Sequence, residues 1–390
     1  MPPEFSGTVS VLSFAHLGYP KDLKSTETHH AAFGLQRADL LDHLYVLALA
    51  DCGELDPKRV DVPVPGGKTI PRAFYLADSL LPIDIDARGV SIALLDWFAS
   101  RRLDDVDVLF SLPQFDRTIQ AQHADGGVVS IYGSTAHPDT NVELFEYECR
   151  RWGYPTGVRS PQDHAYDHGD YVLTLSSFAA ESFVEHGYAA DEVFDVGPLG
   201  IDTAEYPIAD RPDDEFVVLY VANTTALKGL GDLLDAWERL DLEDARLVIC
   251  GSMDDRVERV HRDQLKSLGS VEHVGYVSDP REYYAKASML VHPSITESFG
   301  KVILEAMASA LPVVVTEHCP RDLVDDAGFV VPIRDSDALA DRIRYLHDHP
   351  EEARAMGERG REIAEDSTWE AFGDRVADAH EAILEREGYR

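Results

Sequence analysis

Short apolar runs alternate with amphipathic segments along the whole chain. In parallel α/β folds such runs are buried strands, and the segments between them are helices that cover the sheet. In the first half, the pattern predicts strands at residues 8–14, 44–50, 106–112, 127–133, 171–176 and 192–200. In the second half, it predicts strands at residues 216–222, 245–251, 271–277, 288–294 and 311–317. The expected fold is therefore α/β, with two doubly wound Rossmann-like domains in series.

Helical periodicity fills the intervals between the predicted strands, most clearly at residues 26–43, 176–187 and 367–388. A further helix, beginning near Lys301, is apolar almost all round, so we expect it to be buried. A carboxylate on that helix, Glu305, must then find partners, because burying an unpaired charge is costly.

The join between the two halves falls within residues 197–216, which are rich in Gly, Pro and Asp. We expect an N-terminal domain over residues 1–200, a linker over 201–214 and a C-terminal domain over 215–366. Residues 367–390 form a last helix that could pack back on the N-terminal domain. Two such domains facing each other enclose a cleft, and ligands bind at the carboxyl ends of their strands.

The chain of 390 residues carries 71 acidic against 35 basic residues, for a formal net charge of −36. Few of the basic residues are lysine. An excess of Asp with few Lys is typical of the surface of a salt-in halophile, and a merely acidic mesophilic protein is the alternative. The charge argues against broad nucleic-acid binding, which needs a cationic surface.

The four cysteines lie far apart, with no metal-ligand spacing, and are typical of reduced core thiols. The first residues lack the charged and apolar regions of a signal peptide. No run approaches the 18 apolar residues of a membrane span. We therefore expect a cytosolic protein, which could still touch the inner membrane face. Its oligomeric state is not predicted.

Two common nucleotide motifs are missing. GxGxxG does not follow the first strand, which argues against a dehydrogenase, and the P-loop pattern is absent. Instead, Lys228 sits just before a helix expected to begin near Gly229, where the helix dipole disfavours a cation. Lys301 repeats this arrangement after Gly300. An anion bound by backbone amides and both ammonium groups would explain the placement, and we expect a diphosphate between the two helices.

Two carboxylates, Glu297 and Glu305, stand eight positions apart in an apolar stretch. On one continuous helix they would lie roughly 80° apart. Gly300 instead predicts that a loop carries Glu297 and a helix carries Glu305. A buried carboxylate such as Glu305 can accept hydrogen bonds from two ribose hydroxyls, although a structural cap or core ion pair is the alternative. Strand ends offer backbone groups to a base edge, at Gly251, Ser252, Gly275, Tyr276 and Val277.

Residues 292–331 resemble the signature of family-4 retaining glycosyltransferases of GT-B fold, with Glu297 and Glu305 as the E-x7-E element. Residues 220–229 resemble their phosphate turn, with Lys228 matching the usual lysine. The resemblance covers roughly residues 215–375. In the N-terminal half it is limited to strand rhythm and residues 132–153, where His137 resembles a histidine that some members place beside the donor sugar.

The resemblance implies a metal-independent, retaining transfer of a sugar from a nucleotide-diphosphate donor, with no cofactor. Lys228 and the helix N-termini would stabilise the leaving diphosphate. Glu297 would hold sugar hydroxyls or act electrostatically near the anomeric carbon, and His137 would orient the sugar. The donor-binding residues implied are Asn223, Lys228, Gly251, Tyr276, Val277, Glu297, Ser298, Phe299, Gly300, Lys301 and Glu305.

One position departs from the family pattern. The family usually has Arg five residues before the lysine, and this chain has Asn223, which supplies no charge. A catalytically silent GT-B subunit of a glycosylation complex is therefore an alternative, as is a nucleotide-sugar epimerase. The acceptor, a glycan, lipid-linked or small molecule, is expected on the N-terminal domain near Gly18, Lys21 and Lys24. Asp-x-Asp pairs, Asp84/Asp86 and Asp105/Asp107, are treated as chance in so acidic a chain, so no metal site is expected.

Overall fold

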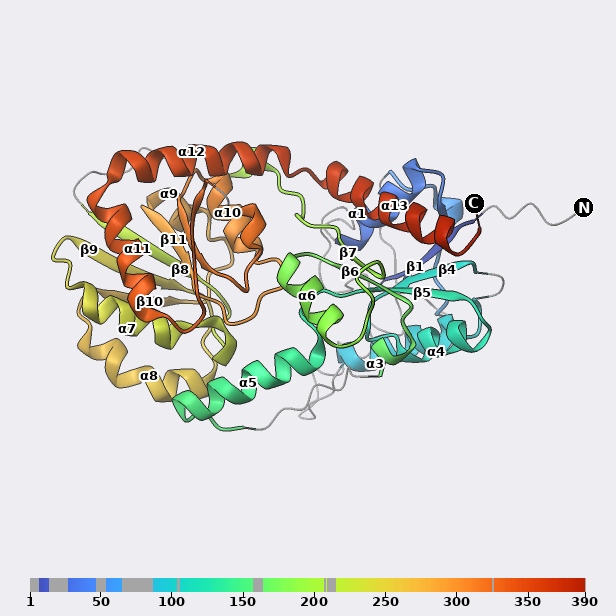
Figure 1. The fold of residues 1–390 in the computed structure, drawn as a ribbon, viewed down its shortest axis with the longest axis horizontal. Helices are drawn as coiled ribbons and strands as arrows, with labels where there is room; N and C mark the ends of the chain where they lie inside the picture. The colour runs from blue at the N-terminus through green and yellow to red at the C-terminus, as the bar shows by residue number, and fades with distance from the viewer. Residues whose placement is uncertain are drawn as a thin grey trace, which may run out of the picture.

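The computed structural model describes residues 7–13, 27–46, 54–64, 87–103, 106–156, 164–206, 208, 215–324 and 326–389. Within them the chain forms two parallel β-sheets, each covered by helices on both faces (Figure 1). This confirms the predicted fold class of two Rossmann-like α/β domains.

The N-terminal sheet has seven strands in the order β3-β2-β1-β4-β5-β6-β7, and all of its pairs are parallel. Its strands are β1 (Val9–Ser13), β2 (Leu41–Val46), β3 (Val60–Asp61), β4 (Val108–Ser111), β5 (Val128–Tyr132), β6 (Tyr171–Thr174) and β7 (Val193–Asp195). Its helices are α1 (Glu27–Arg37), α3 (Ala87–Ala99), α4 (Asp116–Ala124), α5 (Pro138–Trp152) and α6 (Ser177–Glu185).

The C-terminal sheet has six strands in the order β10-β9-β8-β11-β12-β13. They are β8 (Phe216–Val221), β9 (Ala245–Cys250), β10 (Val271–Gly275), β11 (Met289–His292), β12 (Val313–Thr316) and β13 (Gly328–Val331). The helices are α7 (Leu230–Leu240), α8 (Asp255–Ser267), α9 (Arg281–Lys286), α10 (Lys301–Ala308), α11 (Ser336–Asp348), α12 (Pro350–Asp366) and α13 (Trp369–Arg386).

Strand alternation builds the core on both faces of each sheet, because successive side chains of a strand point to opposite faces. Leu109 of β4 packs in the cluster with α3 and α4. Its neighbours Val108 and Phe110 pack in the cluster with α1 and α13. In the C-terminal domain, Val218 faces α7 and α11, while Leu219 faces α10. These strands are apolar at nearly every position because both faces are covered.

Helix α13 crosses back to the N-terminal domain and packs against α1 (Figure 1). Two glycines make this contact possible, since a Cβ on Gly34 would lie 2.0 Å from the carbonyl oxygen of Gly373. The link is also polar, because His380 of α13 lies 2.9 Å from the Ser130 hydroxyl of β5. The last helix therefore forms part of the hydrophobic core of the first domain.

Three details differ from the sequence-based expectation. The helix predicted over residues 26–43 ends at Arg37, because Asp39 takes a left-handed φ of 58° and Leu41 begins β2. The two-residue strand β3 and the strand β13 were not predicted. Each lies at an edge of its sheet and is only partly buried, so neither has the continuous apolar run that marks the central strands.

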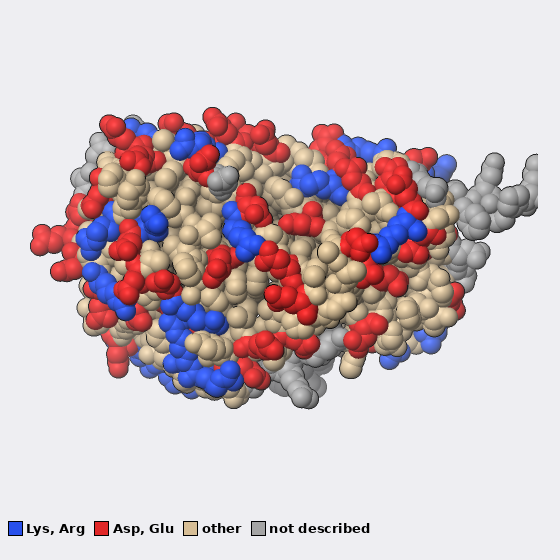
Figure 2. Space-filling view, in the orientation of Figure 1, with Lys and Arg blue, Asp and Glu red and all other residues tan. Residues whose placement is uncertain are grey.

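Figure 2 shows acidic side chains spread over the visible face of both domains, in keeping with the net charge of −36. In the part of the chain that the structure describes, no helix combines the length and apolarity needed to cross a membrane.

Candidate active site

Most of the predicted donor residues lie at the carboxyl edge of the C-terminal sheet. Strand order places β8 between β9 and β11, so the loops that follow these strands are neighbours. Asn223 and Lys228 follow β8, Gly251 follows β9, and Glu297 follows β11. Residues far apart in sequence are therefore brought to one edge, where α/β folds bind ligands.

The turn after β8 needs a glycine to bring Lys228 close to the β11 loop. Gly229 has a left-handed φ of 66°, and a Cβ there would lie 1.9 Å from the Pro293 carbonyl oxygen. The backbone is further fixed because the Tyr220 hydroxyl donates to the Lys228 carbonyl at 3.0 Å. The prediction that a helix begins at Gly229 to Leu230 agrees with α7.

Lys228, Glu297 and His292 form a compact polar cluster. The Lys228 Nζ lies 2.5 Å from Oε2 of Glu297, and the His292 Nε2 lies 2.8 Å from the same oxygen. Burial alone would raise the pKa of Glu297, but the His292 hydrogen bond and the Lys228 charge outweigh it and lower that pKa to about 2. Glu297 is therefore ionised at neutral pH and already accepts hydrogen bonds from two side chains.

Sequence reasoning missed His292. It ends β11, is 2% exposed and stands five positions before Glu297. The available signal was a histidine at the carboxyl end of a buried strand, directly before Pro293, in the same stretch that carries Glu297. A histidine there can hydrogen-bond to a carboxylate in the loop that follows the strand.

Helix α10 begins at Gly300, whose left-handed φ of 67° lets the loop turn sharply into the helix. Glu305 lies in its interior and accepts a hydrogen bond of 2.8 Å from the buried Tyr284 hydroxyl. Burial raises the pKa of Glu305, and the Tyr284 hydrogen bond offsets this only in part. The loop places Glu297 and the helix places Glu305, as the sequence predicts, and Glu305 already has one core partner.

Lys301 and Lys228 have different partners in this structure. The Lys301 ammonium pairs with Glu27 of α1, across the two domains, and is about half exposed. Lys228 pairs with Glu297 in its own domain. For both lysines to bind one diphosphate, as expected from the sequence, the Lys228–Glu297 and Lys301–Glu27 ion pairs would both have to break.

The remaining predicted donor residues differ widely in exposure. Tyr276 is 73% exposed, and the Phe299 ring is buried in the core. Gly251 has a φ of 125°, and a Cβ there would lie 1.9 Å from the Ala222 carbonyl oxygen. The other three residues predicted to bind the sugar donor are Asn223, Ser298 and Val277.

Asn223 is exposed and accepts a hydrogen bond from the Ser252 hydroxyl at 2.9 Å. Ser298 donates its backbone N–H to Oε1 of Glu297 at 3.2 Å, and Val277 is half-buried.

His137 caps the N-terminus of α5, where its Nδ1 accepts from the Asp139 backbone N–H at 3.3 Å. Its ring stacks on His186 with centroids 4.1 Å apart and an angle of 11° between planes. Nitrogen atoms of both rings and the Asp139 carboxylate lie within 4.8 Å of one another. Because the rings are nearly parallel, their in-plane lone pairs do not converge on one point, so the group is poorly arranged for a metal ion.

Helix α5 belongs to the N-terminal sheet by connectivity but docks on the C-terminal domain (Figure 1). Its Arg151 donates twice to buried Asp232 of α7, at 2.6 and 3.1 Å. Its Trp152 packs directly over Gly231, where a Cβ would lie 2.5 Å from the indole ring. The helix that begins at His137 is thus fixed against the domain that carries Lys228 and Glu297.

The acceptor residues predicted from sequence, Gly18, Lys21 and Lys24, lie outside the described residues. So do Asp84, Asp86 and Asp105 of the Asp-x-Asp pairs. Asp107 has a structural role, because its carboxylate accepts from the Thr8 backbone N–H at 3.0 Å.

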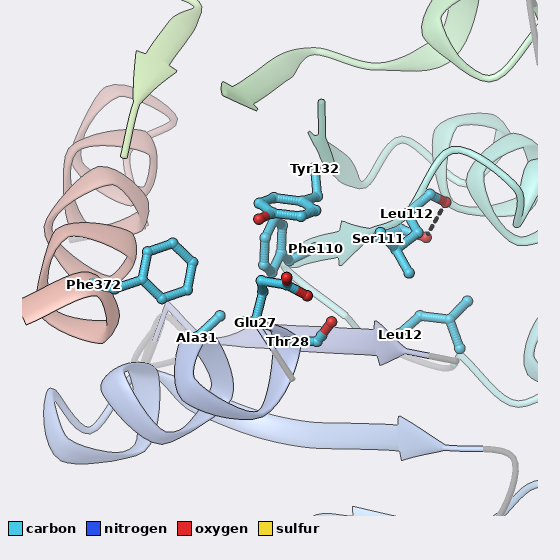
Figure 3. Close-up of a pocket in the computed structure, with 9 residues that line it drawn as sticks. All are labelled: Leu12, Glu27, Thr28, Ala31, Phe110, Ser111, Leu112, Tyr132 and Phe372. Atoms are coloured by element: carbon cyan, nitrogen blue, oxygen red, sulfur yellow. Dashed lines mark hydrogen bonds between the residues drawn. The ribbon is translucent and has the colours of Figure 1, made fainter. Parts of the chain in front are cut away.

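An apolar pocket lies at the carboxyl ends of β1, β4 and β5 (Figure 3). Its lining includes Leu12, Phe110, Tyr132 and Phe372, with Glu27 and Thr28 of α1 beside them. The Tyr132 hydroxyl is buried and has no hydrogen-bond partner among the described residues. Burial and the nearby Glu27 charge raise the Tyr132 pKa well above its ordinary value, so the phenol stays protonated. The phenol lies near Glu27, which pairs with Lys301 of α10.

The chain is similar in sequence to known glycosyltransferases. The family described as "Glycosyl transferases group 1" matches residues 203–363. The putative glycosyltransferase EpsD of Bacillus subtilis is 30% identical over 181 residues, covering 44% of this chain and 47% of EpsD. The chain thus spans about half the length of the curated relatives it matches.

Two solved structures share the whole architecture. Sucrose-phosphate synthase from Thermosynechococcus elongatus has a TM-score of 0.66 at 19% identity, covering 97% of this chain and 100% of that chain. HepE of Anabaena, in complex with UDP and glucose, has a TM-score of 0.62 at 17% identity, covering 95% and 98%. The predicted GT-B fold is therefore confirmed, and residues 203–363 of the C-terminal half match the model of the group 1 glycosyl transferases.

Proposed function

We propose that the protein is a glycosyltransferase that moves a sugar from a nucleotide-diphosphate sugar to an acceptor hydroxyl, with retention and without a metal ion. The observation that carries this proposal is the cluster of Lys228 and Glu297 at the carboxyl edge of the C-terminal sheet. It lies in the matched family segment, and α5 of the other domain packs beside it. The fold neighbour HepE was solved with UDP and glucose, which supports a nucleotide-sugar donor.

In this proposal the acceptor oxygen attacks the anomeric carbon from the face that the diphosphate leaves. The bond from the anomeric carbon to the diphosphate oxygen breaks, and the acceptor proton passes to the departing phosphate. Lys228, the turn before α7 and the N-terminus of α10 stabilise the charge that develops there. Asn223 contributes a neutral amide in place of a second cation. Glu305 binds the ribose hydroxyls, which replace solvent around its half-buried carboxylate.

The acceptor would approach from the N-terminal domain. The pocket at Tyr132 is not itself the acceptor site, because its volume of about 10 Å³ has room for little more than one water molecule. The acceptor is a glycan, a lipid-linked or a small molecule. A lipid-linked acceptor would bring this otherwise cytosolic protein to the inner membrane face.

Nucleotide binding tests the donor site. The thermal unfolding temperature is measured in molar KCl with UDP, GDP, ADP or dTDP. It should rise with one of these nucleotides, and Glu305→Ala should abolish that rise. Glu282→Ala is the matched control, because among the described residues Glu282 pairs only with Lys286 on the surface of α9. If no nucleotide stabilises the folded protein, the proposed function is wrong.

Donor hydrolysis without acceptor separates an enzyme from the silent GT-B subunit that Asn223 suggests. Slow release of free sugar from the sugar nucleotide of the bound base would support the enzyme. The anomeric configuration of the transferred sugar, read by NMR, tests retention, and activity in EDTA tests metal independence. Nucleotide binding without any hydrolysis would support the silent subunit.

A further inference from the structure

The two ring nitrogens of His292 differ in their hydrogen bonding. Its Nε2 lies 2.8 Å from Oε2 of Glu297. Because Glu297 is ionised, it only accepts, so Nε2 must carry the hydrogen. The opposite nitrogen, Nδ1, is buried and has no hydrogen-bond partner among the described residues. Glu297 is therefore the one polar group in the described structure seen to orient the imidazole.

The two donors on Glu297 differ in what they can do. Lys228 is long, about a quarter exposed and placed at the start of α7, where a phosphate would bind. His292 is buried at the end of β11 and has no room to follow it. If a diphosphate draws Lys228 away, Glu297 retains the His292 N–H and the weaker Ser298 backbone N–H at 3.2 Å. A buried carboxylate left with neither cation nor strong donor would be strongly destabilised.

We propose that His292 is a positioning residue that holds Glu297 in place while Lys228 leaves it for the donor diphosphate. The inference rests on the proposed function and deepens it. His292 does not touch the reacting atoms. It lets one lysine serve two partners, Glu297 before binding and the phosphate afterwards. This is especially useful in a chain whose phosphate turn carries Asn223 instead of a second cation.

Two substitutions test the role. His292→Leu removes the donor, whereas His292→Gln can place an amide N–H near the Nε2 position. The assay is hydrolysis of a sugar nucleotide that carries the base found to stabilise the wild type. We expect His292→Leu to lower kcat on the order of 10- to 100-fold, because a charge-assisted hydrogen bond is lost. KM for that donor should also rise, because Lys228 becomes the sole side-chain partner of Glu297. His292→Gln should recover most of both losses.

His380 offers a matched control. It is also fully buried and bonded through Nε2, but to Ser130 in the other domain. His380→Leu and His380→Gln should lower thermal stability without the kcat and KM pattern of the His292 pair. A His292→Leu enzyme with wild-type kcat and KM would overturn the inference. So would equal losses in His292→Leu and His292→Gln, since packing alone would then explain the effect.

A double-mutant cycle on unfolding gives a readout that needs no activity. His292→Leu and Glu297→Gln, singly and together, should be non-additive in their unfolding midpoints in urea with molar KCl. Additive effects would mean that the contact is absent in solution, and the inference would be wrong. If the cycle shows coupling but the wild type neither binds a nucleotide nor hydrolyses a donor, the proposed function falls, and the role of His292 in it falls as well.

Discussion

The Thr296 hydroxyl donates a 2.9 Å hydrogen bond to Oδ1 of Asn141, and this bond joins the two domains. Asn141 lies one helical turn after His137, whose carbonyl accepts from the Asn141 backbone N–H at 3.0 Å. Thr296 directly precedes Glu297. A single contact thus ties the helix that starts at His137 to the loop that carries Glu297.

Breaking this contact should lower the rate more than the stability. For Thr296→Val, which removes only the hydroxyl that bonds to Asn141 of α5, we expect a loss of about 1 kcal/mol in the free energy of unfolding, typical of one hydrogen bond. Donor hydrolysis should fall on the order of tenfold or more, because small misplacements of reacting groups are costly. Glu146→Ala, which removes only an exposed partner of Arg150 on the same helix, should change neither. Equal effects of the two variants would contradict the link.

Removing Lys228 should abolish nucleotide binding and also destabilise the protein. Lys228→Ala leaves the Glu297 carboxylate without its cation, and we expect a loss of about 2 kcal/mol in the free energy of unfolding. The thermal shift from the stabilising nucleotide should disappear. Lys286→Ala, which breaks an exposed pair with Glu282, is the control and should keep the full shift. A Lys228→Ala protein that still binds the nucleotide would exclude this lysine from the donor site.

Tyr132→Phe should not destabilise the protein, in contrast to an ordinary buried tyrosine. The Tyr132 hydroxyl is buried without a partner among the described residues, so its removal should raise the free energy of unfolding by about 1 kcal/mol. Tyr188→Phe is the comparison, since its hydroxyl donates to the Tyr166 carbonyl at 2.7 Å and its loss should destabilise. Donor hydrolysis in Tyr132→Phe should stay within about twofold of the wild type, because Tyr132 lines the pocket of the N-terminal domain and not the Lys228 cluster. A marked loss of stability would show that the phenol has a partner in solution.

Protonation of His380 should lower the free energy of unfolding when the pH is lowered. Burial lowers the pKa of His380 from its ordinary 6.5 to about 4. Between these values the unfolded chain binds the proton and the folded chain does not, so stability is full above about pH 6.5 and is lost as the pH falls toward 4. The loss amounts to about 3 kcal/mol at the lower limit. Urea unfolding from pH 7 to 4.5 at constant KCl should show a shallower decline for His380→Gln than for the wild type. Parallel declines would contradict the assignment.

Local structure and the order of the elements could be predicted from the pattern of apolar and polar residues. Apolar runs became strands because parallel strands with both faces covered must be apolar throughout, and only edge strands such as β3 and β13 escaped this signal. Glycine marked the sharp turns at Gly229 and Gly300, since both have left-handed φ values. The separation of Glu297 on a loop from Glu305 on a helix also followed from Gly300.

Contacts between side chains that are distant in sequence could not be predicted, because they depend on how the elements pack. Lys228 and Glu297 are 69 residues apart in sequence. They come together because β8 pairs with β11 as well as with β9, the strand that follows it in the chain. Tertiary packing likewise brings Lys301 to Glu27 and docks α5 on the opposite domain. Periodicity reports whether a position is buried, but not which element buries it. That choice depends on strand order and domain packing, which are properties of the whole chain.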